Sequence, residues 1–203
     1  MKIALLHPGE MGAAIGAAAE GEVLWASEDR SQETRARAAA FRDVGALDAL
    51  LGEAEVVLSI CPPHAALDVA RACAAFEGLY VDANAISPAH AAEIAALQPR
   101  FVDGGIVGGP GAPALYLSGD EAEKVASLFP SLETHVVRDA SAVKMVYAAW
   151  SKGTAAMLLA IRDVAAHYGV EEEWRGAAPE LQERLARAEP DGFHRAAAEV
   201  FRA

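Results

Sequence analysis

The stretch Lys-Ile-Ala-Leu-Leu-His-Pro-Gly-Glu-Met-Gly, residues 2–12, decides which fold the chain is expected to adopt. The apolar run Lys2–Leu6 enters a turn that holds Gly9 and Gly12, and an alanine-rich helical stretch follows. A strand, a glycine-containing turn and a helix in this order form the place where a dinucleotide pyrophosphate binds. Gly9 would let the backbone approach the phosphates, and Gly12 would let the helix pack closely on the strand.

The turn differs from the usual Gly-x-Gly-x-x-Gly motif, because His7 stands at its first glycine position. We expect the N–H groups of Glu10 and Met11 to face the ligand, helped by the positive end of the helix dipole. A strand–helix turn that binds no ligand is the alternative. The predicted cofactor-binding residues of this turn are His7, Pro8, Gly9, Glu10, Met11 and Gly12.

Outward from this turn, short apolar runs alternate with alanine-rich helical stretches over residues 1–138. Strands separated by helices are typical of an α/β fold, so we expect a Rossmann-type, mostly parallel sheet with helices on its faces. The expected strands are Lys2–Leu6, Glu22–Ala26, Val56–Ile60, Leu79–Val81, Arg100–Val102, Ala114–Leu117 and His135–Val137. The expected helices are Met11–Ala19, Ser31–Ala40, Leu47–Leu51, His64–Ala74, Pro88–Leu97 and Asp120–Phe129.

Residues 139–203 are expected to form a short all-helical C-terminal domain that serves substrate binding and dimerisation. The stretch Ser141–His167 contains no proline and is apolar on nearly all sides, which is typical of a long buried helix. Two shorter helices are predicted at Pro179–Ala188 and Phe193–Arg202. Because so small a domain cannot cover the long helix, we expect a homodimer through the C-terminal helices.

A second group of candidate cofactor residues follows the second expected strand. Ser27, Arg30 and Ser31 are suited to bind the 2′-phosphate of an adenosine, which favours NADP. Glu28 and Asp29 favour NAD instead, because a carboxylate there would accept a hydrogen bond from the ribose 2′-hydroxyl. Ser31 also suits the N-cap of the next helix, a role compatible with the first. We therefore expect NADP, with NAD as the alternative.

Charge and composition narrow the classes of partner. The 203 residues carry 17 Lys and Arg against 29 Asp and Glu, a formal net charge of −12. A dense basic surface is needed for nucleic acids and for anionic membranes, so we expect neither partner, and a small-molecule substrate instead. Cys61, Cys73 and the six histidines show no metal-ligand spacing, so no metal is expected. The lack of a signal-peptide pattern at Met1–Leu6 and the paucity of cysteine favour the cytoplasm.

With these elements placed, the chain resembles the β-hydroxyacid dehydrogenase superfamily, which includes 6-phosphogluconate dehydrogenase, 3-hydroxyisobutyrate dehydrogenase and the imine reductases. It resembles most closely the branch whose C-terminal domain is described as phosphogluconate-dehydrogenase-like. The resemblance covers nearly the whole chain. The segments that carry it are His7–Gly12, Ile60–Pro63, Asp82–Pro88, Asp103–Gly109 and Lys144–Val146.

The resemblance implies a role for each of these segments. The strand end with Cys61, Pro62 and Pro63 would lie under the nicotinamide ribose. Asn84 would bind the nicotinamide amide or a substrate hydroxyl, with an Asx turn as the alternative. The substrate loop would include Val107, Gly108 and Gly109.

The composition of the glycine-rich stretch around that loop indicates a function without the resemblance. It is too rich in glycine for a simple connection, so we interpret it as backbone that lies close to a ligand. A wide hairpin turn is the alternative. The residues concerned are Gly104, Gly105, Gly108, Gly109, Gly111, Pro110 and Pro113.

The predicted long helix carries the candidate catalytic residues. At 100° per residue, Lys144, Tyr147 and Ser151 lie on one face. A desolvated lysine can exchange a proton with a substrate oxygen while hydride moves at the neighbouring carbon. Lys144, the catalytic lysine that the resemblance implies, is therefore the predicted general acid and base. Tyr147 and Ser151 are predicted to act as a proton relay or as substrate anchors. The alternatives are that Lys144 reaches solvent at the helix start and that Tyr147 packs in a core or a dimer.

Three departures from the family pattern keep other functions open. Ala148 stands where the family has Asn, Tyr147 where the phosphogluconate enzymes have His, and Val107 where the family has Ser. We expect an NADP-preferring oxidoreductase that transfers hydride between the nicotinamide and a small hydroxy acid or keto acid. One alternative is an NADP(H)-binding protein with reduced or lost catalysis. Another is an enzyme similar to imine reductases, with Tyr147 as its acid.

Overall fold

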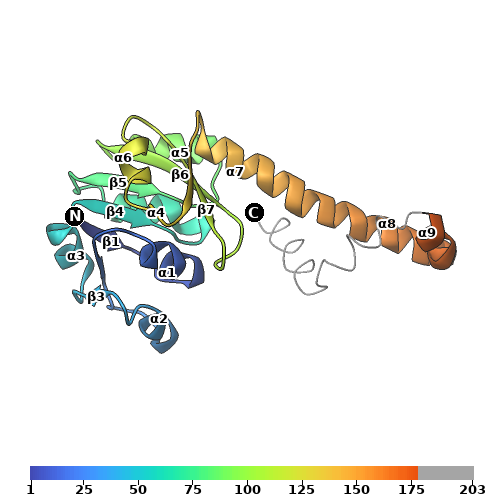
Figure 1. Ribbon diagram of the computed structural model, residues 1–203, viewed down its shortest axis with the longest axis horizontal. Helices are drawn as coiled ribbons and strands as arrows, with labels where there is room; N and C mark the ends of the chain where they lie inside the picture. Colours follow the sequence, from blue (N-terminus) through green and yellow to red (C-terminus); the bar gives the residue numbers. More distant parts are fainter. Residues whose placement is uncertain (178–203) are drawn as a thin grey trace. The chain divides into compact units, whose positions relative to one another are not determined.

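The computed structural model describes residues 1–177, and a single sheet organises the first part of the chain, up to Met145. Its eight strands follow the order β3-β2-β1-β4-β5-β6-β7-β8. Figure 1 labels all of them except β2 and β8. All neighbouring strands are parallel except β6 and β7, which are antiparallel. The expected mostly parallel α/β sheet is thus confirmed.

The strands occupy nearly the predicted places, with two differences. The short strand β3 was not predicted, because its two residues are charged and exposed and show no apolar run. The strand β6 extends through Val107, well beyond the predicted Arg100–Val102. The strands are β1 (Lys2–Leu5), β2 (Glu22–Trp25), β3 (Arg42–Asp43), β4 (Val56–Ser59), β5 (Leu79–Asp82), β6 (Phe101–Val107), β7 (Ala114–Ser118) and β8 (Glu133–Val136).

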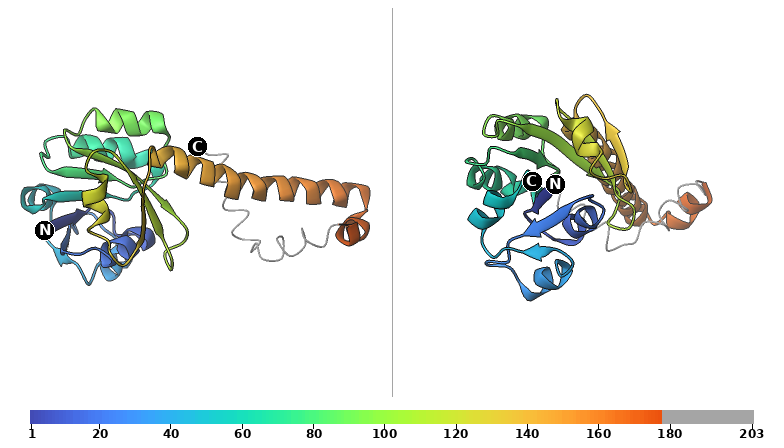
Figure 2. Two further views of the ribbon diagram at one scale, coloured as in Figure 1. Left: turned by 45° about the horizontal axis from the view of Figure 1, so that its top comes forward. Right: turned by 60° about the vertical axis from the view of Figure 1, so that its left-hand side comes forward.

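Helices cover both faces of this sheet (Figures 1 and 2). The helices α1 (Glu10–Ala17) and α6 (Ala122–Ala126) pack on one face, where Leu5 and Leu58 contribute to the core. The helices α3 (Leu47–Glu53), α4 (Ala66–Ala72) and α5 (Pro88–Ala95) pack on the other face. The 3-10 turn η1 (Pro63–Ala65) precedes α4, and α2 (Gln32–Arg37) buries none of its residues. Strands buried on both faces explain the nearly continuous apolar runs of the sequence.

The glycine-rich stretch divides between a strand and a turn. Gly104 and Gly105 lie inside β6, so the prediction that they belong to a loop is wrong. Close packing requires them there: a Cβ at Gly104 would lie 2.9 Å from Asp82 O, and one at Gly105 would lie 3.0 Å from Ala140 O. From Gly108, whose φ is 91°, the chain makes the antiparallel turn into β7. This part forms a hairpin turn, and the interpretation that its backbone lies close to a ligand stays a prediction.

The predicted long helix is present, with one irregularity. It consists of α7 (Ala140–Ala148), the π-helical segment η2 (Ala149–Gly153) and α8 (Thr154–Tyr168). Some of its apolar side chains are exposed, since Val146 is 71% exposed and Trp150 is 63% exposed, whereas Leu158 and Ala165 on α8 are buried. The expectation that a second subunit covers this helix stays a prediction.

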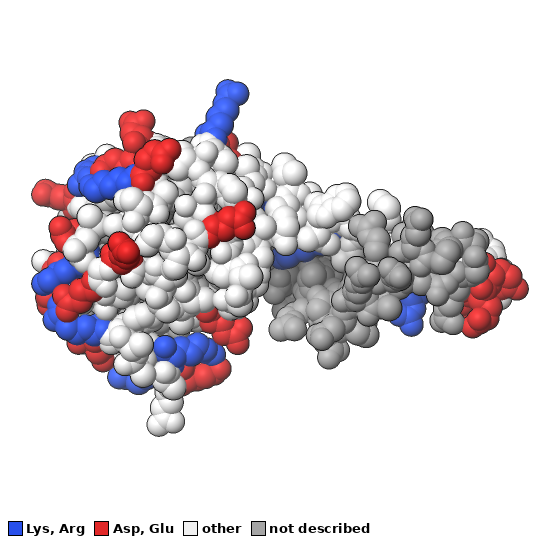
Figure 3. Space-filling view, viewed as in Figure 1, with Lys and Arg blue, Asp and Glu red and all other residues white. Residues whose placement is uncertain are grey.

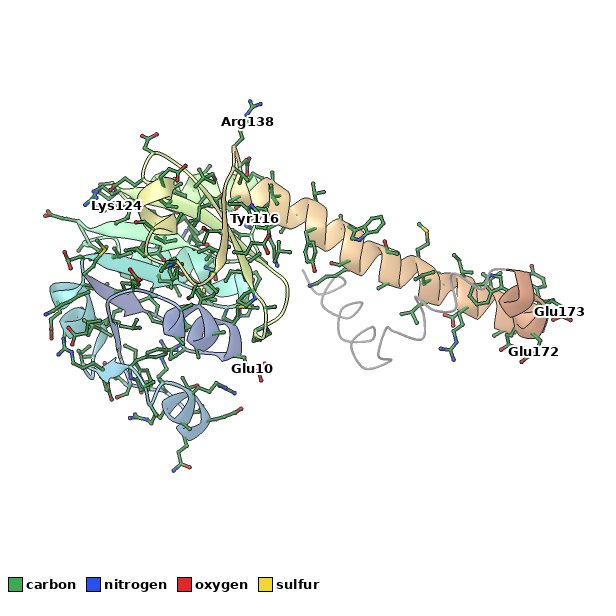
Figure 4. All side chains as sticks on the ribbon, in the orientation of Figure 1. Glu10, Tyr116, Lys124, Arg138, Glu172 and Glu173 are labelled. Carbon is green, nitrogen blue, oxygen red and sulfur yellow. The ribbon has the colours of Figure 1, made fainter. Side chains whose placement is uncertain are left out.

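The chain divides into two compact units after Met145. The first turn of α7 belongs to the sheet unit, because its backbone is hydrogen-bonded to side chains of β6 and β7. The second unit begins at Val146 and includes α9 (Glu171–Ala177). Glu172 and Glu173 lie in the first turn of α9 (Figure 4), where acidic side chains interact favourably with the positive end of the helix dipole. The predicted helices Pro179–Ala188 and Phe193–Arg202 lie outside the described residues, and the boundary at residues 138 and 139 stays a prediction.

Candidate cofactor and substrate site

The strand order fixes where a ligand can enter the sheet. The strand β1 lies between β2 and β4, so the chain crosses from one half of the sheet to the other beside β1. In open α/β sheets a ligand binds at such a switch point, outside the carboxyl ends of the strands. The turns after β1, β2, β4 and β5 all lie at this edge, because these strands are parallel.

The turn between β1 and α1 has open space beside Gly9 and is closely packed at Gly12. Gly9 precedes α1, and its N–H donates to His7 O at 2.8 Å. A Cβ at Gly12 would lie 2.2 Å from His7 O, so only glycine lets the helix pack here, as predicted. A Cβ at Gly9 would meet no atom within 4 Å. Space for a phosphate therefore exists beside Gly9, and its occupation stays a prediction.

A pocket of about 320 Å³ opens between the ends of β1 and β2 and the helices α3 and α4. This volume is within the usual range for small-molecule sites, which begins at about 300 Å³. Apolar side chains from four elements form most of its wall, while the charged groups come from the turn after β2. The lining residues are Leu6, His7, Ala26, Glu28, Asp29, Arg30, Leu47, Leu50, Val69, Ala72 and Cys73.

Two buried polar atoms at this pocket have no hydrogen-bond partner among the described residues. They are Nδ1 of His7 and Nε of Arg30. Burial, and then the nearby Arg30 guanidinium, lower the pKa of His7 to about 4, so the imidazole is neutral at pH 7. Buried polar atoms are normally paired, so two unpaired ones beside a pocket suit a polar ligand.

The turn after β2 is held by a residue that sequence reasoning missed. Arg35 Nη2 donates to Ser27 O at 2.7 Å, and Arg35 Nε donates to Arg30 O at 3.2 Å. Ser31 caps α2, with its Oγ accepting from Thr34 N–H at 3.2 Å. The N-cap role predicted for Ser31 is thus confirmed. Arg35 carried no signal in the sequence beyond its place one turn into a predicted helix.

Asn84 is buried and fully engaged within the chain. Its Oδ1 accepts from Cys61 N–H, and its Nδ2 donates to Ser59 Oγ at 3.1 Å and to Asp82 Oδ2 at 2.9 Å. The amide therefore ties the end of β4 to the end of β5. Its predicted bond to the nicotinamide or the substrate would need one of these partners to be shared or exchanged.

The neighbouring strand end presents Pro62 and Pro63 at the surface. Burial, with the nearby Asp82 carboxyl adding to it, raises the pKa of the Cys61 thiol to about 11. Cys61 therefore stays a thiol at neutral pH, which makes it a poor nucleophile. This end of β4 can pack against a ligand but offers it no reactive group.

Lys144 lies on the first turns of α7, beside β6. Its Nζ donates a hydrogen bond to Ile106 O, close to the carboxyl end of that strand. The parallel strands β1 and β6 end at the same edge of the sheet, so the amine and the turn after β1 share that edge. Val107 ends β6, and the predicted substrate residues Gly108 and Gly109 follow it in the exposed turn.

Tyr147 and Ser151 belong to the second unit. Ser151 Oγ donates to Tyr147 O at 2.8 Å, so this hydroxyl is bound to the backbone of its own helix. The predicted common stripe assumes 100° per residue, but Ala149–Gly153 is π-helical and its turns are wider. The constant step behind that prediction therefore does not hold as far as Ser151, and its role as a substrate anchor stays a prediction.

Two further findings bear on the expected partners. No group of three or more His, Cys, Asp or Glu within the described residues is arranged to hold a metal ion. None of the helices in residues 1–177 combines the length and the apolar character that crossing a membrane requires. On the face shown in Figure 3, Lys and Arg side chains lie scattered among Asp and Glu.

Comparisons with known proteins agree with this fold. Residues 13–108 match the family described as the saccharopine dehydrogenase NADP binding domain. No curated protein sequence matches the chain. One solved structure, a conserved protein of unknown function described as similar to 3-hydroxyacid dehydrogenases, is 26% identical with a TM-score of 0.71. That match covers 97% of this chain and 80% of the other.

Two enzymes with known activities are among the other similar structures. The 3-hydroxyisobutyrate dehydrogenase of Mycobacterium tuberculosis is 24% identical, with a TM-score of 0.62 and coverage of 83% of this chain and 66% of that one. An imine reductase from Myxococcus stipitatus, solved with NADP⁺, is 18% identical, with a TM-score of 0.69 and coverage of 92% and 73%. The expected resemblance to the β-hydroxyacid dehydrogenase superfamily is confirmed at the level of the fold.

Proposed function

We propose that the chain is an NADP-dependent oxidoreductase that transfers hydride between the nicotinamide and a small hydroxy acid or keto acid. The observation that carries this proposal is the position of Lys144, whose amine lies at the carboxyl edge of the sheet, bonded to Ile106 O. The turn with free space beside Gly9 lies at the same edge. The match of residues 13–108 to an NADP-binding domain supports the cofactor.

The residues around the pocket suggest how the cofactor is held. The pyrophosphate would lie beside Gly9, facing the N–H groups of Glu10 and Met11 at the start of α1. The adenosine would enter the pocket between α3 and α4, with the guanidinium of Arg30 near its 2′-phosphate. His7 Nδ1 would then obtain the hydrogen-bond partner that the described chain does not supply.

Lys144 would move the proton of the reaction. When bound, NADP supplies the hydride acceptor at C4 of its nicotinamide. As the hydride leaves the substrate carbon, the neutral amine of Lys144 would take the hydroxyl proton, and its ammonium form would return that proton in the reverse direction. Tyr147 and Ser151 remain proposed as a relay or as substrate anchors.

A titration with NADPH and with NADH tests the cofactor. Trp25 lies buried at the end of β2, so energy transfer from tryptophan to the nicotinamide reports binding. We expect saturable binding that is tighter for NADPH. Absence of binding by both nucleotides at about millimolar concentration, which corresponds to a binding free energy near −4 kcal/mol, would sink the proposal.

A screen of hydroxy acids, keto acids and imines then tests the chemistry. Lys144→Ala should lower the turnover by a factor of about 100 or more while NADPH binding is retained. Lys124→Ala is the control, because Lys124 is an exposed residue of α6 that pairs with Glu121, the residue before that helix. If NADPH binds but no substrate is turned over, the alternative of a nucleotide-binding protein with lost catalysis is favoured. Ala148 and Val107, which replace the polar residues of the family pattern, support that alternative.

An activity on imines would favour the second alternative. The fold is shared with imine reductases, so the screen compares imines with keto acids directly. In that case Tyr147→Phe should abolish turnover, because the phenol would supply the proton. If Tyr147→Phe leaves imine reduction unchanged, Tyr147 is not the acid.

We also propose that a second copy of the chain covers the apolar side chains of the long helix. Trp150 and Met157 are 63% and 66% exposed, and Val146 and Val164 are exposed as well. Exposed apolar patches of this kind mark interaction sites. Light scattering after gel filtration should give a dimer for the wild type and a monomer for Trp150→Glu with Met157→Glu. A monomeric wild type would contradict this.

The free thiols Cys61 and Cys73 suit the proposed cytoplasmic location.

A further inference from the structure

Four polar residues form a row across the sheet, and the start of α7 is hydrogen-bonded to two of them. Ser59 of β4 pairs in register with Asp82 of β5, Asp82 pairs with Asp103 of β6, and Asp103 pairs with Ser118 of β7. Residues in register on neighbouring strands point to the same face of a sheet. All four are buried, although the strands around them are apolar. None of them is needed as a ligand of the cofactor or the substrate in the proposed function.

Asp103 binds the first turn of α7 through a dense set of hydrogen bonds. Its Oδ2 accepts from Ser141 N–H at 2.7 Å, and its Oδ1 accepts from Ser141 Oγ at 2.6 Å. Ser118 Oγ donates to Asp103 Oδ2 at 3.2 Å and accepts from Ala140 N–H at 3.0 Å. Two strands thus satisfy two backbone N–H groups at the helix start, which otherwise have no partner within a helix. The carboxylate also suits the positive end of the helix dipole.

Lys144 lies about one helical turn beyond this attachment. Lys144 follows Ser141 by three residues, almost one helical turn. Gly105 lies on β6 between Asp103, which bonds to Ser141, and Ile106, which accepts from Lys144. A Cβ at Gly105 would lie 3.0 Å from Lys144 Cβ. With Asp103 holding the first turn and Gly105 admitting the next, the Nζ of Lys144 reaches Ile106 O. The start of α7 therefore contacts β6 at Asp103, Gly105 and Ile106 in turn.

We propose that Asp103 is a positioning residue for Lys144, acting through Ser141 and Ser118. The consequence for catalysis rests on the proposed function, whereas the position of the amine does not. Burial raises the pKa of Asp103, and hydrogen bonds from Ser141 and Ser118 oppose that rise. The neighbouring Asp82 carboxyl accepts from the N–H and Nδ2 of Asn84 and so has its own partners.

The test measures the reactivity of the Lys144 amine directly. Acetic anhydride is added to the folded full-length protein, and the acetylation rate of each lysine is followed by peptide mass spectrometry. Asp103→Asn keeps the shape but removes the charge, and should raise the Lys144 rate by about tenfold, since a bond to a charged group contributes about 1.5 kcal/mol or more. Ser141→Ala removes one hydrogen bond and should raise it by about fivefold.

Controls separate positioning from general loss of stability. Ser59→Ala is the matched variant, because Ser59 is a buried member of the same row but bonds to Asn84 instead of α7. It should leave the Lys144 rate unchanged. The rates of Lys2 and Lys124 serve as internal standards, since a globally loosened fold would raise them too.

Two outcomes overturn the proposal. One is a Lys144 rate within about twofold of the wild type in both variants, a change under 0.5 kcal/mol. The other is a rise in Lys144 reactivity that Lys2 and Lys124 share. Failure of the proposed function gives a different result: the Lys144 rate changes as expected, but neither nucleotide binding nor turnover is found. If turnover is found, Ser141→Ala should lower kcat and leave the NADPH dissociation constant unchanged.

Discussion

The two halves of the carboxyl edge of the sheet differ in whether the buried polar side chains described below have hydrogen-bond partners. Beside β1 and β2, His7 Nδ1 and Arg30 Nε have no partner among the described residues, and a pocket of about 320 Å³ adjoins them. Beside β5, β6 and β7, the side chains of Asp82, Asn84 and Asp103 all bond within the chain. The first half has the features that the proposed nucleotide site needs, whereas in the second half Asn84 joins β4 to β5 and Asp103 holds the start of α7.

This difference separates binding from positioning in terms that can be measured. Unpaired buried groups cost free energy until a ligand pairs with them, so their removal should affect binding more than stability. Paired groups stabilise the fold, so their removal should affect stability or the position of α7. The following predictions test this division, beginning with the largest expected effect.

The two glycines of the β1–α1 turn should respond in opposite ways. Gly12→Ala forces a Cβ to within 2.2 Å of His7 O and should cost about 3 kcal/mol of unfolding free energy or prevent folding. Gly9→Ala meets no atom of the chain and should change that free energy by less than about 1 kcal/mol, yet weaken NADPH by tenfold or more. Urea unfolding and the fluorescence titration measure both. Unchanged NADPH affinity in Gly9→Ala would place the pyrophosphate elsewhere.

His7 and Asp82 should give the protein opposite pH dependences. The pKa of His7 is lowered to about 4 in the folded state, so its contribution to stability is lost as the pH falls from about 6.5 to 4. Burial raises the pKa of Asp82 to about 6, so its contribution is lost as the pH rises from about 4 to 6.

Substitution of either residue should therefore tilt the pH profile of stability in opposite directions. His7→Asn should reduce the loss of unfolding free energy between pH 7 and pH 4.5, and Asp82→Asn should enlarge it, each by up to about 3 kcal/mol. Urea unfolding at both pH values measures the slopes, in which the exposed ion pairs common to all variants cancel. Equal slopes in the two variants would show that neither group titrates as inferred.

Arg30 should decide the preference between the two nucleotides. Arg30→Ala should weaken NADPH by about tenfold and NADH by less than about twofold, because only NADPH carries the 2′-phosphate. Arg37→Ala is the control, since Arg37 lies on α2 and forms an exposed ion pair with Glu33. A loss that is equal for NADPH and NADH would mean that Arg30 acts on the turn and not on the phosphate.

The smallest expected effect distinguishes two helix caps. Ser31 caps α2 beside the pocket and Ser87 caps α5, each accepting from a backbone N–H. Replacement of either by Ala should cost about 1 kcal/mol of unfolding free energy. Only Ser31→Ala should also weaken NADPH, by a few-fold. If both variants bind NADPH like the wild type, Ser31 is a cap alone.

Much of the fold could be read from the chain because its signals are local. The alternation of apolar runs and alanine-rich stretches predicted seven of the strands, and the turn with Gly9 and Gly12 predicted the start of α1. The strand β3 was missed, since Arg42 and Asp43 form a strand only because β2 offers them a free edge. The prediction of a loop at Gly104 and Gly105 is wrong, because the neighbours that require glycine there come from β5 and α7 and cannot be read from the local sequence.

In the candidate site, too, some features follow from local sequence and others only from contacts in the folded chain. The sequence by itself determined the parallel sheet, the glycine turn and the identity of Lys144 as a candidate, because periodicity, glycine spacing and motif order are properties of neighbouring residues. Only the tertiary structure decided that Asn84 is turned inward and that Asp103 holds Ser141. Those contacts join strands and a helix that lie far apart in the chain. Burial then fixes their strength, because a polar group removed from water must find its partner wherever the fold places one.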